Sequence, residues 1–194
     1  MKANVWPVAS KNNSRDRVKR TGELMSQLLH ETSAARVLDI GGNDFTPLAE
    51  TMGWDYVTID LAEPQPVGTG GHQSGTTLTY DGKTLPFGPS SFDLINVGFV
   101  LHHAAENTLG ILRQIKDISR RYVLVGEDIA DQHYPTEWHE RNFAHHPGGI
   151  FRSDEEWCEL FALYSLRLLQ KHVVRRVDDC DDRHYRVIYV LDAS

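Results

Sequence analysis

Short apolar runs typical of β-strands alternate with helical stretches along most of this 194-residue chain. Strands that are separated by helices pair in parallel, because a parallel connection has to cross back over the sheet. The pattern therefore predicts an α/β fold in which helices cover a mainly parallel sheet. The runs expected to be strands span residues 37–40, 56–60, 77–80, 92–97 and 122–127.

Amphipathic segments predict the helices. Residues 109–121 carry isoleucines at i, i+4 and i+7, which form one apolar face. Residues 15–31 predict an N-terminal helix that leads into the first strand, although Gly22 weakens its middle. Another helix is expected to begin at Ser153, because Ser153 and Glu156 form an S-x-x-E capping box.

The C-terminal part of the chain breaks the alternation. Two strand-type segments, 166–169 and 185–191, are separated by the acidic, turn-forming stretch 178–182 and by no helix. A connection this short cannot cross over a sheet, so these segments are expected to form an antiparallel hairpin. The glycine-rich stretch 68–75 is expected to be a loop.

Composition indicates a globular protein with one core. The hydrophobic fraction is 40%, the charged fraction is 24%, and the formal net charge is −7, which disfavours sequence-independent binding of nucleic acid. No run approaches the length of a membrane span, and no signal-type apolar core follows the first residues, so a cytoplasmic location is the default expectation. Both cysteines, Cys158 and Cys180, lie outside any CxxC pattern.

The turn after the first strand is a candidate ligand site. Asp39 lies near the end of this strand, which ends at Ile40, and Gly41 can supply a positive φ and a close backbone approach to a ligand. Pro47 suits the first position of the following helix. Such a turn is also common without any ligand, but Asp60 ends the second strand about 20 residues later, where a carboxylate can accept both hydroxyl protons of a ribose. Together they favour a cofactor that contains adenosine.

These motifs resemble a known family. Residues 37–45, Asp60 and residues 81–93, which include Leu-Pro-Phe and Phe-Asp, are similar to successive motifs of class I, Rossmann-like, S-adenosylmethionine-dependent methyltransferases, and the resemblance spans essentially the whole chain. It implies a seven-stranded, mostly parallel sheet with a C-terminal antiparallel hairpin and helices on both faces. It also implies one domain over 1–194, with an N-terminal helical segment over 1–32.

The resemblance assigns roles around S-adenosylmethionine as cofactor. It implies that one acid binds the ribose, that another binds the adenine amino group, and that the end of the fourth strand lies under the sulfonium. The residues expected at the cofactor are Asp39, Gly41, Asp60, Leu61, Asp81, Gly82, Asn96 and Val97. Asn43 and Phe45 stand where the family usually has glycines; Asn43 tolerates a positive φ, whereas Phe45 is expected to pack on the cofactor or on a helix.

The acceptor is expected beyond the carboxyl ends of the later strands, where ligands of open α/β sheets bind. Residues 128–152 are predicted to form a lid over it. Tyr134, Trp138 and Arg141 are its candidate substrate-binding residues, with Arg141 able to hold a carboxylate.

Histidines are the candidate general bases. His103, His133 and His139 are the catalytic candidates, although each is also compatible with an imidazole on a solvated loop. The spacing of the histidines in this region matches no recognised zinc pattern, so no metal is expected.

The preferred function is methyl transfer to an oxygen or nitrogen of a small polar acceptor, in a protein that is a monomer or a homodimer. Methylation of RNA or protein is an alternative, since basic residues at 11–20 form either a binding edge or a solvated helix face. A non-catalytic module that binds S-adenosylmethionine is another alternative, suggested by Phe45. An NAD-dependent oxidoreductase is disfavoured by the terminal hairpin and by Asp81.

Overall fold

A computed structural model describes residues 8–10, 13–42, 45–61, 76–130, 148–176 and 185–194. Their strands form one sheet with the order β1-β7-β8-β6-β5-β2-β3-β4. The strands are β1 (Val8–Ser10), β2 (Arg36–Ile40), β3 (Asp55–Leu61), β4 (Thr76–Tyr80), β5 (Phe92–Gly98), β6 (Ser119–Asp128), β7 (Arg167–Arg176) and β8 (Tyr185–Asp192).

The pairing of the strands confirms the predicted sheet. Strands β2 to β6 pair in parallel with one another, and β8 is antiparallel to both of its neighbours, β6 and β7. The predicted seven strands with a C-terminal hairpin are therefore present. The three-residue strand β1 adds an eighth at the edge, parallel to β7. Its sequence, Val-Ala-Ser, is too short to show an alternating pattern.

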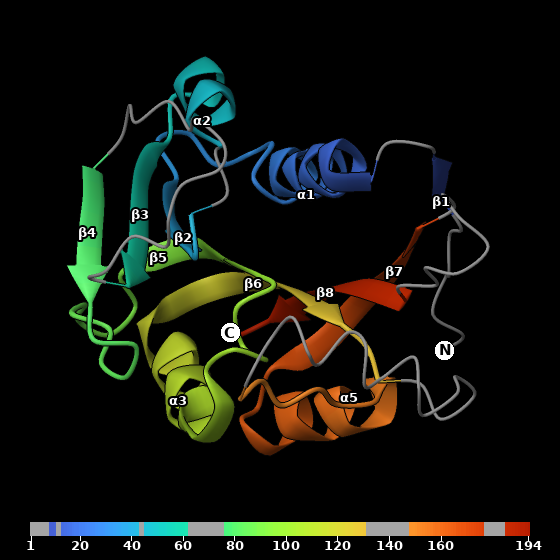
Figure 1. Cartoon of the computed structure of the whole chain (residues 1–194). Coiled ribbons are helices and arrows are strands. Elements are labelled where there is room, and N and C mark those ends of the chain that lie inside the picture. Colours follow the sequence, from blue (N-terminus) through green and yellow to red (C-terminus); the bar gives the residue numbers. More distant parts are fainter. Residues whose placement is uncertain (1–7, 11–12, 43–44, 62–75, 131–147, 177–184) are drawn as a thin grey trace.

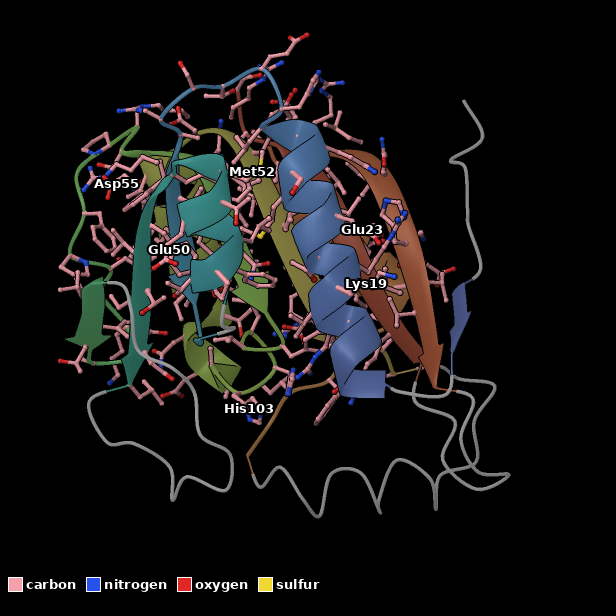
Figure 2. The ribbon with its side chains drawn as sticks, turned by 90° about the horizontal axis from the view of Figure 1, so that it is seen from above. Lys19, Glu23, Glu50, Met52, Asp55 and His103 are labelled. Carbon is pink, nitrogen blue, oxygen red and sulfur yellow. The ribbon has the colours of Figure 1, made fainter. Side chains whose placement is uncertain are left out.

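Helices cover both faces of the sheet (Figure 1). Helix α1 (Asn13–Leu28) and helix α2 (Thr46–Met52) lie side by side over one face, as Figure 2 also shows. Helix α3 (Thr108–Ile118), preceded by the short 3-10 helix η1 (Ala105–Asn107), and helix α5 (Asp154–Leu163) lie on the other face. The core accordingly has two apolar clusters, one on each side of the sheet.

Helix α3 is shorter than predicted. The sequence pattern extended this helix to residue 121, whereas the structure ends it at Ile118 and starts β6 at Ser119. Ser119 has φ −81° and ψ 136°, and it pairs in register with Phe92 of β5. Strand pairing thus overrides the helical periodicity at these last residues.

The predicted helix start at Ser153 is confirmed. The Glu156 backbone N–H donates to Ser153 Oγ at 3.1 Å, and the Ser153 N–H donates to Glu156 Oε2 at 2.7 Å. Both bonds of the capping box are present, so two backbone donors of the first turn are satisfied locally.

Gly22 has a packing role in the middle of α1. A Cβ atom at this position would lie 3.3 Å from Leu48 Cδ2 and 3.7 Å from Phe45 Cε1. The missing side chain therefore lets α1 approach the start of α2 closely. Phe45 is buried in this contact, so of the two partners expected for its ring, the helix is the one it packs against.

Candidate functional site

The carboxyl ends of four neighbouring strands meet at one edge of the sheet. Ile40 is in register with Ile59 and with Val97, and Leu61 is in register with Tyr80. This register brings the segments that follow β2, β3, β4 and β5 to the same edge. The residues predicted from three separate motifs are therefore close in space, as expected for a ligand site of an open α/β sheet.

The turn after β2 requires glycine for two reasons. Gly41 has φ +90°, and a Cβ at this position would come within 2.2 Å of Val100 Cγ2. Gly42 has φ +65°, and its Cβ position lies 3.4 Å from Asp60 Oδ2. The bare backbone of the turn thus lies against the carboxylate at the end of β3. Asn43 lies outside the described residues.

Two exposed carboxylates lie at the ends of β3 and β4. Asp60 Oδ1 accepts a hydrogen bond of 2.7 Å from the Leu61 N–H. Asp81 Oδ1 accepts from the backbone N–H groups of Thr84 at 2.7 Å and Lys83 at 2.8 Å. These hydrogen bonds, with that from Thr84 the stronger, hold the pKa of Asp81 below its usual range. Asp81 is therefore ionised at neutral pH and acts as a hydrogen-bond acceptor.

Tyr80 and Leu61 lie close to these two acids. Burial raises the pKa of the Tyr80 hydroxyl, and the negative charges of Asp60 and Asp81 raise it further, so Tyr80 remains a neutral phenol. The Leu61 side chain is 49% exposed, and its Cδ2 lies 3.0 Å from the Cβ position of Gly82. An exposed apolar side chain next to acceptor oxygens suits a ligand with both a flat apolar part and hydroxyl groups.

Asp39 lies beneath the turn and is fully buried. Its Oδ1 accepts from the Asn96 side-chain amide at 2.7 Å, and its Oδ2 accepts from the Tyr56 hydroxyl at 2.7 Å. The Tyr56 hydroxyl in turn accepts from the Phe45 N–H at 3.3 Å. Asp39 and Asn96, both predicted to be at the cofactor, thus form a buried network that supports the turn from below.

Phe99, which directly follows β5, adopts a strained backbone conformation. Its φ is +62°, and its N–H donates to the Gly126 carbonyl at 2.7 Å. A Cβ at Gly126 would lie 2.9 Å from Phe99 Cε2, so this glycine leaves room for the ring. The Arg17 guanidinium lies 4.6 Å from the ring centroid, and that of Arg186 lies 5.4 Å from it. Sequence patterns gave no signal for this cluster, because its members come from three distant segments.

The two adjacent histidines after β5 have different environments. His102 is buried, and its Nδ1 lies 2.6 Å from Oε2 of the equally buried Glu127. Burial raises the pKa of Glu127, and the hydrogen bond and charge of His102 oppose this rise. His103 is exposed, with its ring 4.0 Å from that of His102. His103 is therefore the member of the pair that a ligand at the carboxyl edge can reach, and Figure 2 places it at the opposite end of the sheet from Asp55.

Both ends of the predicted lid are fastened next to each other. Ile129 pairs with Arg152 in an isolated parallel bridge, and the Ala130 N–H donates to the Arg152 carbonyl at 2.9 Å. The Ile150 N–H donates to the His102 carbonyl at 2.8 Å. The segment thus leaves and re-enters the fold at the carboxyl edge. The candidates within it, His133, Tyr134, Trp138, His139 and Arg141, lie outside the described residues.

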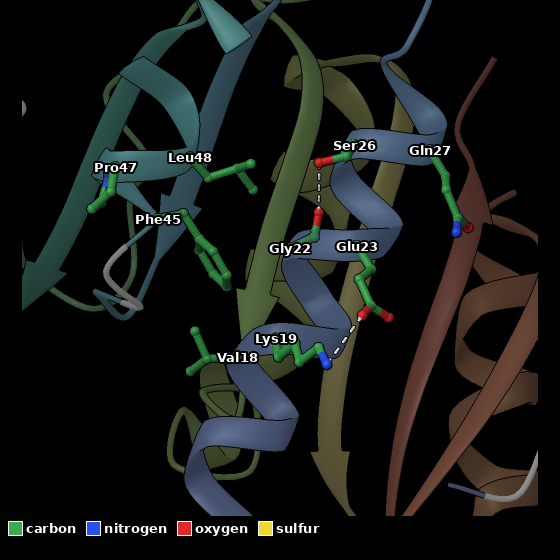
Figure 3. A pocket seen from close by; sticks show the side chains of 9 residues that line it. All are labelled: Val18, Lys19, Gly22, Glu23, Ser26, Gln27, Phe45, Pro47 and Leu48. Atoms are coloured by element: carbon green, nitrogen blue, oxygen red, sulfur yellow. Dashed lines mark hydrogen bonds and ion pairs between the residues drawn. The ribbon is translucent and has the colours of Figure 1, made fainter. Parts of the chain in front are cut away.

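A groove of about 570 Å³ lies on the face of the sheet that α1 and α2 cover, between α1 and the start of α2 (Figure 3). It is mostly apolar, and Lys19 and Glu23 form an ion pair of 4.0 Å beside it. The groove is distinct from the edge that carries Asp60 and Asp81. Its lining residues are Val18, Lys19, Gly22, Glu23, Ser26, Gln27, Phe45, Pro47 and Leu48.

Within the described residues, no group of three or more His, Cys, Asp or Glu side chains is arranged to hold a metal ion. In the same part of the chain, no helix has the length and apolar character needed to cross a membrane.

Comparisons with known proteins show the fold. No family model and no curated protein sequence matches the chain. Among solved structures, it is similar to the Burkholderia thailandensis 1,6-didemethyltoxoflavin-N1-methyltransferase with bound 1,6-didemethyltoxoflavin and S-adenosylhomocysteine, at 18% identity and a TM-score of 0.63, covering 99% of this chain and 94% of that one.

Two other solved structures are similar over most of their length. One is a putative sarcosine dimethylglycine methyltransferase from Galdieria sulphuraria, at 12% identity and a TM-score of 0.70, covering 93% of this chain and 88% of that one. The other is the [4+2]-cyclase SpnF, at 13% identity and a TM-score of 0.69, covering 98% of this chain and 86% of that one. The chain thus has the Rossmann-like fold found in these proteins.

Proposed function

We propose that this chain binds S-adenosylmethionine at the carboxyl ends of β2 to β5 and transfers its methyl group to an oxygen or nitrogen of a small polar acceptor. The observation that carries the proposal is the contact between the glycine turn and an exposed carboxylate. Asp60 Oδ2 lies 3.4 Å from the Cβ position of Gly42, so a side chain there would crowd the place where a ribose would meet Asp60.

The residues at this edge fit the parts of the cofactor. Asp60 would accept hydrogen bonds from the ribose hydroxyls, and Asp81, at the next strand end, would accept from the adenine amino group. The exposed face of Leu61 would cover apolar surface of the adenosine. Asp39 and Asn96 would position the turn at the methionine end, since they are buried beneath it. The bound S-adenosylhomocysteine named for the Burkholderia enzyme supports this cofactor.

The cofactor supplies a methyl group on a positively charged sulfur, which an acceptor lone pair can displace in line. The protein then has two tasks, which are to place the acceptor and to remove its proton if it has one. His103 is the proposed base, because it is exposed at the carboxyl edge, in the segment between β5 and η1. His133 and His139 are further candidates, and Tyr134, Trp138 and Arg141 are proposed to contact the acceptor from the segment 128–152.

A small acceptor is preferred to a nucleic acid. Lys19 and Arg20 of the basic N-terminal stretch both pair with Glu23, at 4.0 and 3.0 Å, and Arg17 lies over Phe99. These contacts disfavour a continuous cationic edge on α1. Phe45, which suggested a non-catalytic module, packs against α1 instead of standing in the crevice. We propose a single domain over 1–194 that acts as a monomer or homodimer.

Isothermal titration of the folded protein with S-adenosylhomocysteine tests the proposal. We expect saturable binding with one site per chain, and NAD should not compete. Lack of binding by folded protein, or displacement by NAD, would overturn the assignment. A screen of small amines, phenols and carboxylates with S-adenosylmethionine would then identify the acceptor, whereas cofactor binding without transfer to any of them would favour a non-catalytic module.

A further inference from the structure

We propose that Arg17 and Arg186, whose guanidinium groups both contact the Phe99 ring, bind a carboxylate group of the acceptor. That the ligand is the methyl acceptor rests on the proposed function, but binding of a carboxylate at this cluster can be tested without methyl transfer.

The cluster is assembled from segments far apart in the sequence. Arg17 comes from α1, Phe99 follows β5, Asp128 ends β6, and Arg186 lies at the start of β8. The guanidinium carbon of Arg17 lies 4.6 Å from the centroid of the Phe99 ring, and that of Arg186 lies 5.4 Å from it. Contacts of this kind hold both cations beside a flat apolar surface.

The charges of the cluster do not balance. Arg186 Nε donates to Asp128 Oδ1 at 2.6 Å, so one guanidinium has a carboxylate partner. Arg17 makes no ion pair with the described residues, and its Nε is buried there without a hydrogen-bond partner. Burial lowers the pKa of Arg17, the charge of Arg186 lowers it further, and Asp128 opposes both. Because arginine stays protonated, the cluster keeps one excess positive charge in a poorly solvated place.

The cluster lies on the side of the edge where an acceptor would bind. In the sheet order β8-β6-β5-β2-β3-β4, the acids Asp60 and Asp81 lie on the β3 and β4 side of the glycine turn. Arg17 and Arg186 gather on the β5, β6 and β8 side. The residue after Phe99 is Val100, whose Cγ2 lies 2.2 Å from the Cβ position of Gly41. The cluster is therefore adjacent to the glycine turn after β2, because Val100, which contacts Gly41, directly follows Phe99. It lies on the opposite side of this turn from Asp60 and Asp81.

A carboxylate fits this cluster better than a phosphate. The planar fork of a guanidinium matches the two oxygens of a carboxylate, and a group with a single negative charge balances the single excess positive charge. A phosphate monoester carries close to two negative charges at neutral pH and would leave the site with a surplus. The ring of Phe99 would contact the apolar part of the same molecule.

Benzoate, neutral benzamide and phenyl phosphate are suitable probes, because they share one ring and differ in charge. Their affinities would be measured by ligand-observed NMR titration, with and without saturating S-adenosylhomocysteine. The variants are Arg17→Gln and Arg17→Lys. Arg36→Gln is a matched control, because the Arg36 guanidinium also lies over a phenylalanine, 4.9 Å from the Phe92 ring, but at the other end of the sheet.

We expect benzoate to bind more tightly than benzamide, and Arg17→Gln to weaken benzoate by about tenfold, an effect typical of losing one charge-assisted pair. The affinity of Arg17→Lys for benzoate should lie between those of wild type and Arg17→Gln, and Arg36→Gln should bind benzoate as tightly as wild type. Equal benzoate affinity in Arg17→Gln and wild type would overturn the proposal, as would tighter binding of phenyl phosphate. Affinity for S-adenosylhomocysteine is measured on the same samples. If wild type did not bind S-adenosylhomocysteine, the proposed function would be rejected, whatever the result with benzoate.

Discussion

The side-chain amide of Asn96 donates a hydrogen bond of 2.7 Å to the carboxylate of Asp39, its register partner on the neighbouring strand. Asp39 is fully buried, and Tyr56 donates to its other oxygen from the strand on the opposite side. A buried carboxylate is stable only when such donors replace water. The two bonds therefore tie β2 to both of its neighbours directly below the glycine turn.

Removing a donor from this network should destabilise the fold. Asn96→Ala leaves the buried carboxyl group of Asp39 with one hydrogen-bond donor fewer, so we expect the free energy of unfolding to fall by about 2–4 kcal/mol. Tyr56→Phe keeps the ring in the core and removes only the hydroxyl, so a loss of about 1–3 kcal/mol is expected. Urea denaturation of both variants measures these changes. An unchanged denaturation midpoint in Asn96→Ala would contradict the role given to this bond.

Asp60→Ala should weaken cofactor binding without unfolding the protein. Losing a charge-assisted pair of hydrogen bonds to the ribose should cost about 1.5–3 kcal/mol of binding free energy, or roughly 10- to 150-fold in affinity. Because Asp60 is exposed, stability should change by less than about 1 kcal/mol. Asp60→Asn should give an intermediate affinity for S-adenosylhomocysteine by calorimetry.

The control for this experiment is Asp55→Ala, which removes an exposed acid from the other end of the same strand. Asp55 makes a surface ion pair of 3.0 Å with Arg36, so its loss should have a small effect on stability and none on cofactor affinity. Equal weakening in both variants would show that Asp60 acts through net charge and not through contact with the ribose.

Gly41→Ala should be destabilising for two separable reasons. A positive φ costs an alanine about 1–2 kcal/mol, and the collision of its Cβ with Val100 adds about 1–3 kcal/mol of overpacking. In the double variant Gly41→Ala/Val100→Ala, the stability lost through overpacking should be recovered, whereas the cost of the positive φ should remain. Thermal and urea denaturation of the two single variants and the double variant measure the coupling. If the changes in the free energy of unfolding of the two single variants simply added up in the double variant, the Val100 contact would not be the source of the strain.

Folding stability should depend on His172 at mildly acidic pH. The Arg20 guanidinium can only donate to His172 Nδ1, at 3.0 Å, so the imidazole is neutral with its proton on Nε2, facing Gln170 Oε1 at 3.1 Å. Burial, followed by the charge of Arg20, lowers the pKa of His172 to about 4. Below about pH 6.5 the unfolded chain therefore binds a proton that the folded chain binds only near pH 4.

The stability of wild type should thus fall between pH 6.5 and 4 by about 1–3 kcal/mol more than that of His172→Gln. Urea denaturation at several pH values measures this difference. The variant His30→Gln, which changes an exposed histidine just after α1, should follow the wild-type profile. Parallel profiles for wild type and His172→Gln would contradict the pKa assigned to His172.

The sequence by itself determined the elements whose causes are local. The capping box at Ser153 depends on residues three positions apart, and the strand at 92–97 depends on a continuous apolar run, so both were predicted correctly. The C-terminal hairpin followed from the absence of a helical segment between two strand patterns. The end of α3 was predicted wrongly, because Ser119 is drawn into β6 by pairing with Phe92, a contact that helical periodicity does not contain.

At the candidate site, the sequence identified the acids that end strands, and the tertiary structure decided how each is presented. Asp60 and Asp39 both belong to strand ends, but strand register leaves Asp60 exposed and buries Asp39 between Tyr56 and Asn96. The cluster of Arg17, Phe99 and Arg186 exists only once α1 packs across the sheet and β8 inserts beside β6. Its members have no common sequence pattern, because contacts between distant segments depend on strand order and helix packing, which short-range periodicity does not encode.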